Sequence, residues 1–226
     1  MKKFLVIGNP IDHSLSPKLH NYWIKQNDIN AIYEKQKLEE SDLENLILNV
    51  RNQKIYGINV TIPFKKSVIP FLDKLSVEAQ KTQSVNTVYL DDNKTIGHNT
   101  DIGGFEMSIQ KLNINLSNKT VLILGAGGVV PSIILALMRM KVLKVIVSNR
   151  TREKAENLKN LFNNITVIDW GEIPNVDVFI NATSIGLKKE DKMHLDFSSI
   201  GNNKFFYDVI YNPKETGFLK TGKKLG

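Results

Sequence analysis

Short apolar segments alternate with amphipathic segments along most of the chain. KFLVIG, AIYEKQK and IYGINVTI have the pattern and composition of β-strands. The stretch after the first strand predicts a helix, with Ser16 as its capping residue and Pro17 in its first turn. A capping box at Ser41–Glu44 predicts the start of a second helix, LENLILNVRNQ. Strands that alternate with helices are typical of an α/β protein with a mostly parallel sheet.

The pattern changes after the third predicted strand. Pro63 stands at the position favoured for the start of a helix, which places Lys65 in the first turn of that helix. SVNTVYL and KTIGHNT then predict two strands joined by a hairpin turn at Asp91–Asn93. The segment DIGGFEMSIQKL predicts a further helix, and Asp101 is suited to cap it.

A second unit is predicted to begin near residue 102. KTVLILGAGGVVPSIILALMRM contains a buried strand at Val121–Leu124, a glycine-rich turn and an apolar helix. In dinucleotide-binding units the glycine at the Gly125 position makes the tight turn, and the one at the Gly127 position lets the pyrophosphate approach the backbone. Val130 replaces the third glycine of this motif. The alternative is a strand–turn–helix unit that binds no ligand.

The next predicted strand favours a cofactor. Its apolar run ends at Val147, and Asn149 stands 22 residues after Gly127. NAD-binding units carry an Asp or Glu at about this place for the ribose 2′-hydroxyl. Here Arg150 follows Asn149, and a guanidinium can pair with a 2′-phosphate that an acidic residue would repel. The pattern predicts NADP rather than NAD, and the alternative is a surface arginine with no ligand.

Composition narrows the classes of partner. The sequence has no cysteine and only 4 histidines, without a metal-ligand spacing, so we expect neither a disulfide framework nor a metal site. The net charge of +7 comes from lysines scattered among acidic residues, which disfavours nucleic acid and suits an anionic small molecule. The first apolar run is too short for a signal peptide, and no segment has the length of a membrane span. We therefore expect a cytoplasmic protein with no membrane partner.

Several polar residues follow the predicted strands of the first half. Hydroxyl and amide groups of this kind can hold a substrate that carries several hydroxyl groups. Simpler roles exist for some of them: Ser16 and Asp101 can cap helices, and Asn86 and Asn99 can be turn residues. The candidates are Ser14, Ser16, Asn59, Thr61, Asn86 and Asp101.

Distinctive sequence blocks are spread over both halves of the chain. In order, up to residue 213, they are GNPIDHSLSPKLHN, GINVTIPFKK, SVNTVY, GHNTDIGGF, ILGAGG, SNRTREKA, INATSIGL and YDVIYNP. In content, order and spacing they resemble the signature blocks of the shikimate dehydrogenase family. The resemblance implies two α/β domains: residues 1–101 for the substrate, and residues 102–226 with a Rossmann-type fold for NADP. It also implies an active site in the cleft between them.

The resemblance further implies an oxidoreductase acting on a CH–OH group. Such an enzyme reversibly reduces 3-dehydroshikimate to shikimate with NADPH, in the shikimate pathway to chorismate and the aromatic amino acids. Lys65 and Asp101 fall on the family's catalytic pair, where a proton must reach the developing alkoxide as hydride arrives. The resemblance leaves open which of the two relays the proton. Ser14 and Ser16 resemble the carboxylate-binding serines, and the other implied substrate contacts are Asn59, Thr61, Asn86 and Tyr211.

The cofactor residues implied by the resemblance form three groups. The pyrophosphate group comprises Gly125, Ala126, Gly127, Gly128 and Val129. The group around the adenosine ribose and its phosphate comprises Asn149, Arg150, Thr151, Arg152 and Lys154. The group on the nicotinamide side comprises Asn181, Ala182, Thr183, Ser184 and Val209.

Two departures from the family pattern affect these expectations. Lys154 is the later basic residue of the SNRTREKA block, so we expect phosphate recognition to depend on Arg150 with help from Arg152. The chain stops at GFLKTGKKLG, where the family continues into C-terminal helices that return to the first domain, so we expect this sequence to lack them. The alternatives are a quinate/shikimate dehydrogenase and an NADP-binding protein without turnover. A monomer or a homodimer is expected in each case.

Overall fold

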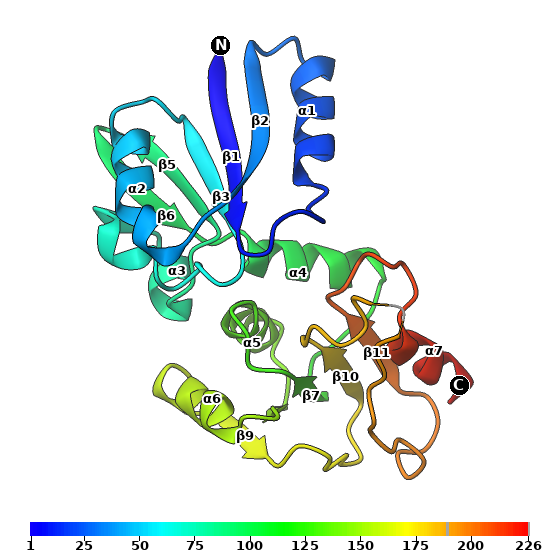
Figure 1. Cartoon of the computed structure of the whole chain (residues 1–226). Coiled ribbons are helices and arrows are strands. Elements are labelled where there is room, and N and C mark those ends of the chain that lie inside the picture. The colour runs from blue at the N-terminus through cyan, green and yellow to red at the C-terminus, as the bar shows by residue number, and fades with distance from the viewer. Residues whose placement is uncertain (189, 226) are drawn as a thin grey trace. The chain divides into compact units, whose positions relative to one another are not determined.

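The computed structural model describes residues 1–188 and 190–225 of the chain. They form two compact units: unit 1 is Met1–Ile102, and unit 2 is the part from Gly103 onward. Each unit contains one β-sheet with helices packed against it (Figure 1). The α/β class predicted from the sequence is confirmed, and the division between the units falls next to the predicted boundary.

Unit 1 is built on a six-stranded sheet in the order β2-β1-β3-β5-β6-β4. β1 pairs in parallel with β2 and β3, whereas β5 pairs antiparallel with both β3 and β6. The predicted hairpin between β5 and β6 therefore makes this sheet a mixed one. The strands are β1 (Lys2–Gly8), β2 (Ala31–Lys37), β3 (Gly57–Val60), β4 (Lys74–Leu75), β5 (Thr87–Asp91) and β6 (Lys94–His98).

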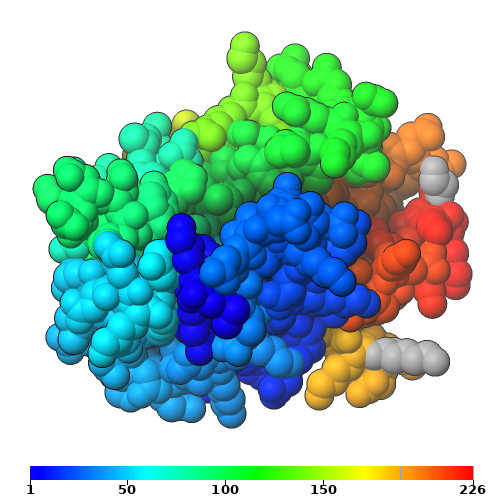
Figure 2. Space-filling model, turned by 90° about the horizontal axis from the view of Figure 1, so that it is seen from above, coloured from blue at the N-terminus to red at the C-terminus, as the bar shows by residue number. Residues whose placement is uncertain are grey.

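The core of unit 1 forms between α2 and the central strands. α2 buries Leu43, Leu46, Ile47 and Val50, which share one helical face because they follow the spacing of an amphipathic helix. By contrast, none of the residues of α1 is fully buried. The exposed surface of this helix is coloured blue in Figure 2. The helices are α1 (Ser16–Gln26), α2 (Leu43–Arg51), α3 (Val77–Thr82) and α4 (Asp101–Lys111), with short 3₁₀ turns at Glu40–Asp42 and Ile69–Phe71; α4 continues into unit 2.

Two predicted helix caps are wrong, although α1 begins within one residue of its predicted start and α2 begins at the predicted Leu43. Ser16 is the first residue of α1 rather than its cap, because the chain is already in a helical conformation at Leu15. A capping box is present, but it joins Glu39 and Asp42 one turn before α2. The predicted box at Ser41–Glu44 was placed too late because a 3₁₀ turn precedes the α-helix.

The predicted helix around Lys65 is also wrong. Residues 62–68 form successive turns, and a short 3₁₀ helix follows at Ile69–Phe71. A continuous α-helix would need the carbonyl of Lys65 to accept from the N–H of Ile69. Instead that carbonyl accepts from the N–H of Val85 at 2.8 Å, and the N–H of Ile69 donates to Lys66. A contact with a distant segment therefore prevents the helix that Pro63 suggested.

Unit 2 is built on a fully parallel five-stranded sheet in the order β11-β10-β7-β8-β9. The strand order reverses between β7 and β10, as it does at the ligand-binding edge of a Rossmann fold. All five strands end at the same edge of the sheet because they are parallel. The strands are β7 (Thr120–Leu124), β8 (Lys144–Ser148), β9 (Ile165–Ile168), β10 (Val178–Asn181) and β11 (Phe205–Asp208).

Aromatic rings and one apolar helix fill the core of unit 2. Phe179 stacks on Phe206 with ring centroids 5.0 Å apart, and Phe218 from α7 packs on Phe206 at the same distance. Val130 is fully buried at the start of α5, so an apolar side chain packs where the dinucleotide motif has its third glycine. The helices are α5 (Val130–Arg139), α6 (Arg152–Glu156) and α7 (Gly217–Lys224), with a 3₁₀ turn at Asn157–Asn160.

Candidate active site

A paired lysine and aspartate lie at the centre of the candidate site in unit 1. The Nζ atom of Lys65 lies 2.6 Å from Oδ2 of Asp101, and the two side chains are only 15% and 22% exposed. Lys65 comes from the turns after β3, and Asp101 is the first residue of α4. A hydrogen bond between two ionised groups is stronger than a neutral one, and partial burial reduces its screening by water. The pair is therefore held together rather than solvated separately.

The carboxylate of Asp101 does not serve as a helix cap. Its own backbone N–H donates to the side-chain oxygen of Asn99 at 3.0 Å, so Asn99 satisfies the start of α4. The second carboxylate oxygen, Oδ1, accepts from Nδ2 of Asn86 at 2.8 Å. Both oxygens of Asp101 thus have a donor, and the capping role that the sequence allowed for this residue belongs to Asn99.

Asn86 and Asn59 link neighbouring strands beside this pair. Oδ1 of Asn86 accepts from the backbone N–H of Thr100 at 2.9 Å, which fixes the orientation of its amide. Nδ2 of Asn59 donates to the backbone oxygen of Asn86 at 3.3 Å and to the hydroxyl of Thr87 at 3.1 Å. Oδ1 of Asn59 accepts from the hydroxyl of Tyr33 at 2.6 Å. The structure therefore joins Lys65, Asp101, Asn86 and Asn59, which the sequence predicted, into one network.

Tyr33 and Thr87 belong to this network and were missed in the sequence. Tyr33 lies on β2, and burial raises the pKa of its phenol well above the usual value, so the hydroxyl stays protonated and can donate. The imidazole of His20 stacks on the Tyr33 ring at 4.1 Å, and burial lowers the pKa of His20. Thr87 directly follows Asn86 in the block SVNTVY, but its cross-strand partner is visible only once the strands are paired.

Thr61, Ser14 and Ser16 lie around the carboxyl end of β1. The N–H of Thr61 donates to the carbonyl of Ile7 at 2.9 Å. A Cβ atom at Gly8 would stand 2.6 Å from Cγ2 of Thr61, so glycine is needed for this close approach. The N–H of Ser16 donates to Oγ of Ser14 at 3.3 Å. Within residues 1–102, all of which are described, no hydrogen bond joins the two serines to Lys65 or Asp101, and their role stays a prediction.

The glycine-rich turn of unit 2 fits the approach of a dinucleotide. Gly125 has φ +117°, and a Cβ atom there would stand 2.7 Å from the carbonyl oxygen of Ala182. The turn therefore packs against the end of β10, where the N–H of Ala182 donates to Leu124 at 2.8 Å. At Gly127 a Cβ atom would meet nothing within 4 Å, which leaves space over the backbone at the start of α5. The other residues predicted for this turn are Ala126, Gly128 and Val129.

The two predicted arginines after β8 differ in their contacts. Arg152 pairs with the carboxylate of Asp169 after β9 and, at 3.2 Å, with Glu156. Arg150 is exposed, and no carboxylate within residues 1–188 and 190–225 forms an ion pair with it. Nδ2 of Asn149 donates to the carbonyl of Thr151 at 2.8 Å and shapes the turn before α6. Of the two guanidinium groups, that of Arg150 is therefore the one available for an anion, and Lys154 is exposed on α6.

Asn181 organises the ends of β10 and β11. Its Nδ2 donates to both carboxylate oxygens of Asp208 at 3.1 Å, and its Oδ1 accepts from the N–H and hydroxyl of Thr183. The hydroxyl of Thr216 donates to Asp208 at 2.6 Å, and the N–H of Val209 donates to Asn181 at 3.0 Å. The structure thus brings Asn181, Ala182, Thr183 and Val209 together at the strand ends beside the glycine turn, and Ser184 follows in the same loop.

Comparison with known proteins identifies the family. Residues 6–88 match the model of the shikimate dehydrogenase substrate binding domain, and residues 106–213 match the model of shikimate / quinate 5-dehydrogenase. The chain is 60% identical over 225 residues to the shikimate dehydrogenase (NADP(+)) of Pelagibacter ubique, covering 100% of this chain and 85% of that protein. The chain belongs to the shikimate dehydrogenase family. The resemblance found in the sequence is confirmed.

Solved structures of shikimate dehydrogenases have the same fold. The crystal structure from Aquifex aeolicus matches with a TM-score of 0.91 at 38% identity, covering 100% of this chain and 84% of that one. The structure from Thermus thermophilus, in complex with NADP(H) and shikimate, matches with a TM-score of 0.90 at 30% identity and covers 100% of this chain and 85% of that one. The assignment of the chain to a family of NADP-dependent oxidoreductases is confirmed by these relatives.

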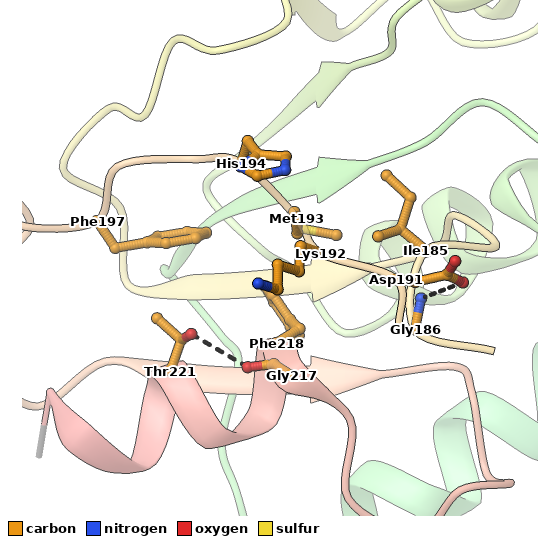
Figure 3. A pocket seen from close by; sticks show the side chains of 10 residues that line it. All are labelled: Ile185, Gly186, Asp191, Lys192, Met193, His194, Phe197, Gly217, Phe218 and Thr221. Atoms are coloured by element: carbon orange, nitrogen blue, oxygen red, sulfur yellow. Dashed lines mark hydrogen bonds between the residues drawn. The ribbon is translucent and has the colours of Figure 1, made fainter. Parts of the chain in front are cut away.

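Unit 2 of this shikimate dehydrogenase family member has two pockets whose lining includes none of the predicted site residues. The smaller, of about 260 Å³, lies between the loop after β10 and α7, with His194, Phe197 and Phe218 among its lining residues (Figure 3). The larger, of about 510 Å³, is an open depression beside Phe206 and Leu219. Tyr211, predicted to contact substrate, is 68% exposed in unit 2, and its role stays a prediction.

Neither a cluster of metal ligands nor a membrane-spanning helix occurs in the part of the chain that the structure describes. Across residues 1–188 and 190–225, His, Cys, Asp and Glu side chains form no group of three or more that could hold a metal ion. None of the helices within these same residues has both the length and the apolar character needed to cross a membrane.

Proposed function

We propose that this chain catalyses the reversible, NADP-dependent interconversion of shikimate and 3-dehydroshikimate. The observation that carries the proposal is the Lys65–Asp101 pair, 2.6 Å apart and mostly buried, in a chain of the shikimate dehydrogenase family. A ketone reduction needs a group that delivers a proton to the developing alkoxide, and a neighbouring carboxylate can keep that group charged and oriented. A lysine held by an ionised carboxylate supplies both.

The roles of the two residues follow from their hydrogen bonds. Both oxygens of Asp101 accept hydrogen bonds, from Lys65 and Asn86, which suits a carboxylate that orients the lysine. The ammonium of Lys65 has three N–H donors, and one of them is used by Asp101. We assign the proton transfer to Lys65: an N–H donates its proton to the substrate oxygen during reduction, and the amine takes a proton back during oxidation.

The residues of unit 2 fit NADP(H) as the redox cofactor. The open space over Gly127 and the turn at Gly125 suit a pyrophosphate at the start of α5, and the exposed guanidinium of Arg150 suits a 2′-phosphate. When bound, the nicotinamide supplies or accepts the hydride. Val209 and the loop Asn181–Ser184 would border it. Ser14, Ser16, Asn59, Thr61, Asn86 and Tyr211 are proposed to bind the carboxylate and hydroxyl groups of the substrate.

The proposal is tested by mixing the protein with shikimate and either NADP⁺ or NAD⁺ and following the formation of reduced nicotinamide. Turnover that prefers NADP⁺ is expected. A parallel reaction with quinate tests the alternative of a quinate/shikimate dehydrogenase. This alternative is relevant because the family model matched by residues 106–213 is named for both substrates. Absence of turnover with shikimate, while NADP⁺ still binds in a titration, would contradict the proposed activity and favour a cofactor-binding protein.

Two expectations from the sequence stay predictions. They are a cytoplasmic location and an assembly no larger than a homodimer. The size of the assembly can be measured by sedimentation of the purified protein.

A further inference from the structure

A continuous chain of hydrogen bonds leads from β2 to the catalytic carboxylate. The hydroxyl of Tyr33 donates to Oδ1 of Asn59 at 2.6 Å, and Nδ2 of Asn59 donates to Oγ1 of Thr87 at 3.1 Å. The hydroxyl of Thr87 donates to Oδ1 of Asn86 at 3.1 Å, and Nδ2 of Asn86 donates to Asp101 at 2.8 Å. Between Tyr33, which donates, and Asp101, which accepts, each group therefore accepts from one neighbour and donates to the next.

Backbone groups fix the direction of this chain. The N–H of Thr100 can only donate, so the atom of Asn86 that it meets at 2.9 Å is the amide oxygen. The carbonyl of Asn86 can only accept, so the atom of Asn59 that lies 3.3 Å from it is the amide nitrogen. With both amides oriented, the hydroxyl of Thr87 has one arrangement that satisfies both: it accepts from Asn59 and donates to Asn86.

The chain of hydrogen bonds points the donor end of Asn86 at Asp101. A reversed amide would place its oxygen against the carboxylate, and two acceptors in contact repel each other. The hydroxyl of Thr87 and the N–H of Thr100 both oppose that reversal. The hydroxyl of Thr100 also lies 2.8 Å from Nδ2 of Asn86, but it can rotate to donate or accept and so suits either orientation of the amide. Tyr33 acts one step further away, because its phenol holds the Asn59 amide that in turn orients Thr87.

We propose that Thr87, supported by Tyr33, is a positioning residue that acts through Asn86 to hold the Asp101 carboxylate against Lys65. This inference rests on the proposed function of Lys65 and Asp101. It gives a role in the reaction to two residues that do not themselves belong to the catalytic pair. A purely structural role, as a contact between strands, is the alternative that the experiment must separate.

The experiment compares Thr87→Val, which removes the hydroxyl at nearly constant volume, with Thr87→Ser, which keeps it. Thr87→Val should lower kcat about tenfold, the effect of losing roughly one to two hydrogen bonds in the transition state. The KM for NADP should not change, because the predicted cofactor residues all belong to unit 2. Thr87→Ser should stay within about twofold of the parent protein. Equal kcat values for the parent and Thr87→Val would overturn the proposal.

A double variant tests whether Tyr33 acts through Thr87. Tyr33→Phe should lower kcat about threefold, and adding it to Thr87→Val should cost little more, because the path is already broken. If the two losses multiply, the residues act independently and the proposed path is wrong. Tyr89→Phe on β5, where the ring is 39% exposed, is the matched control and should leave kcat unchanged.

A measurement without substrate separates this inference from the proposed function. In ¹⁵N spectra, the side-chain amide signals of Asn86 should shift in Thr87→Val and stay in place in Thr87→Ser. If the parent protein shows no turnover but these signals shift, the proposed function fails while the positioning contact stands. If the signals do not move in Thr87→Val, Thr87 does not orient Asn86 and the inference is contradicted, whatever the activity of the parent.

Discussion

The guanidinium of Arg152 is held by the carboxylate of Asp169, which follows the neighbouring strand β9. Arg150, two residues earlier, has no such partner within residues 1–188 and 190–225. The two arginines of the same turn therefore differ in what they can bind. One is engaged inside the protein, and the other is available to an anion from outside.

Arg150→Ala is expected to weaken NADP⁺ binding and leave NAD⁺ binding nearly unchanged. A charge-assisted hydrogen bond contributes about 1.5–3 kcal/mol, so the dissociation constant for NADP⁺ should rise roughly tenfold to a hundredfold. Calorimetric titrations of both cofactors measure the difference. Lys159→Ala, which removes a lysine paired with Glu156, is the charge-matched control. An equal loss of affinity for NADP⁺ and NAD⁺ would show that Arg150 does not read the 2′-phosphate.

Lys65→Ala is expected to lower kcat for shikimate oxidation by a factor of about 10² or more, the usual contribution of a general acid or base. NADP⁺ binding should be retained, since Lys65 belongs to unit 1 and the predicted cofactor residues to unit 2. Steady-state kinetics and a cofactor titration give the two values. Lys66→Ala is the neighbouring control. The assignment is refuted if the Lys65 variant turns over at the parent rate.

Gly125→Ala is expected to destabilise the folded protein. Its φ of +117° disfavours any residue with a Cβ, and that atom would stand 2.7 Å from the carbonyl oxygen of Ala182. A cost of about 1–3 kcal/mol in the free energy of unfolding is expected from the backbone conformation. Denaturant unfolding measures it. Gly127→Ala is the matched control, because a Cβ atom at this position would meet nothing within 4 Å. This variant should affect cofactor binding more than stability. Equal stability losses in both variants would contradict this distinction.

Asp73 gives a prediction for acid stability. The hydroxyl and N–H of Thr95 donate to its carboxylate, and with Arg51 nearby they lower the pKa of Asp73 from 3.8 to about 2. Because the pKa in the folded state is the lower one, this contribution to stability is complete above pH 3.8 and is lost as the pH falls toward 2. Thr95→Val should raise the pKa of Asp73 toward its usual value, whereas Thr95→Ser should not. Carboxyl NMR titration decides between these outcomes.

The sequence predicted the parts of the fold that depend on local pattern. The alternation of apolar segments located β1, β2 and the β5–β6 hairpin, and the glycine turn located the start of α5. The helix predicted at Lys65 was wrong because the N–H of Val85, twenty residues away, takes the carbonyl that the helix needed. Propensity at Pro63 carries no information about that contact.

The candidate site was predictable to a similar extent. Lys65, Asp101, Asn86 and Asn59 were found from sequence blocks, and the structure joins them by hydrogen bonds. Tyr33 and Thr87 were missed because their hydrogen bonds depend on the pairing of β2 with β1, β1 with β3, and β3 with β5. The difference between Arg150 and Arg152 was equally hidden, since Asp169 lies after another strand.

The dipeptide Val85–Asn86 holds both members of the proposed catalytic pair, Lys65 and Asp101. The N–H of Val85 fixes the backbone of Lys65, and the side chain of Asn86 fixes the carboxylate of Asp101. Lysine and aspartate are therefore both held by the two residues that directly precede β5. The conformational entropy that the two side chains lose on being brought together is therefore lost when the protein folds, before substrate binds. Preorganisation of this kind leaves the binding energy of the substrate free for orienting the reacting carbon and oxygen.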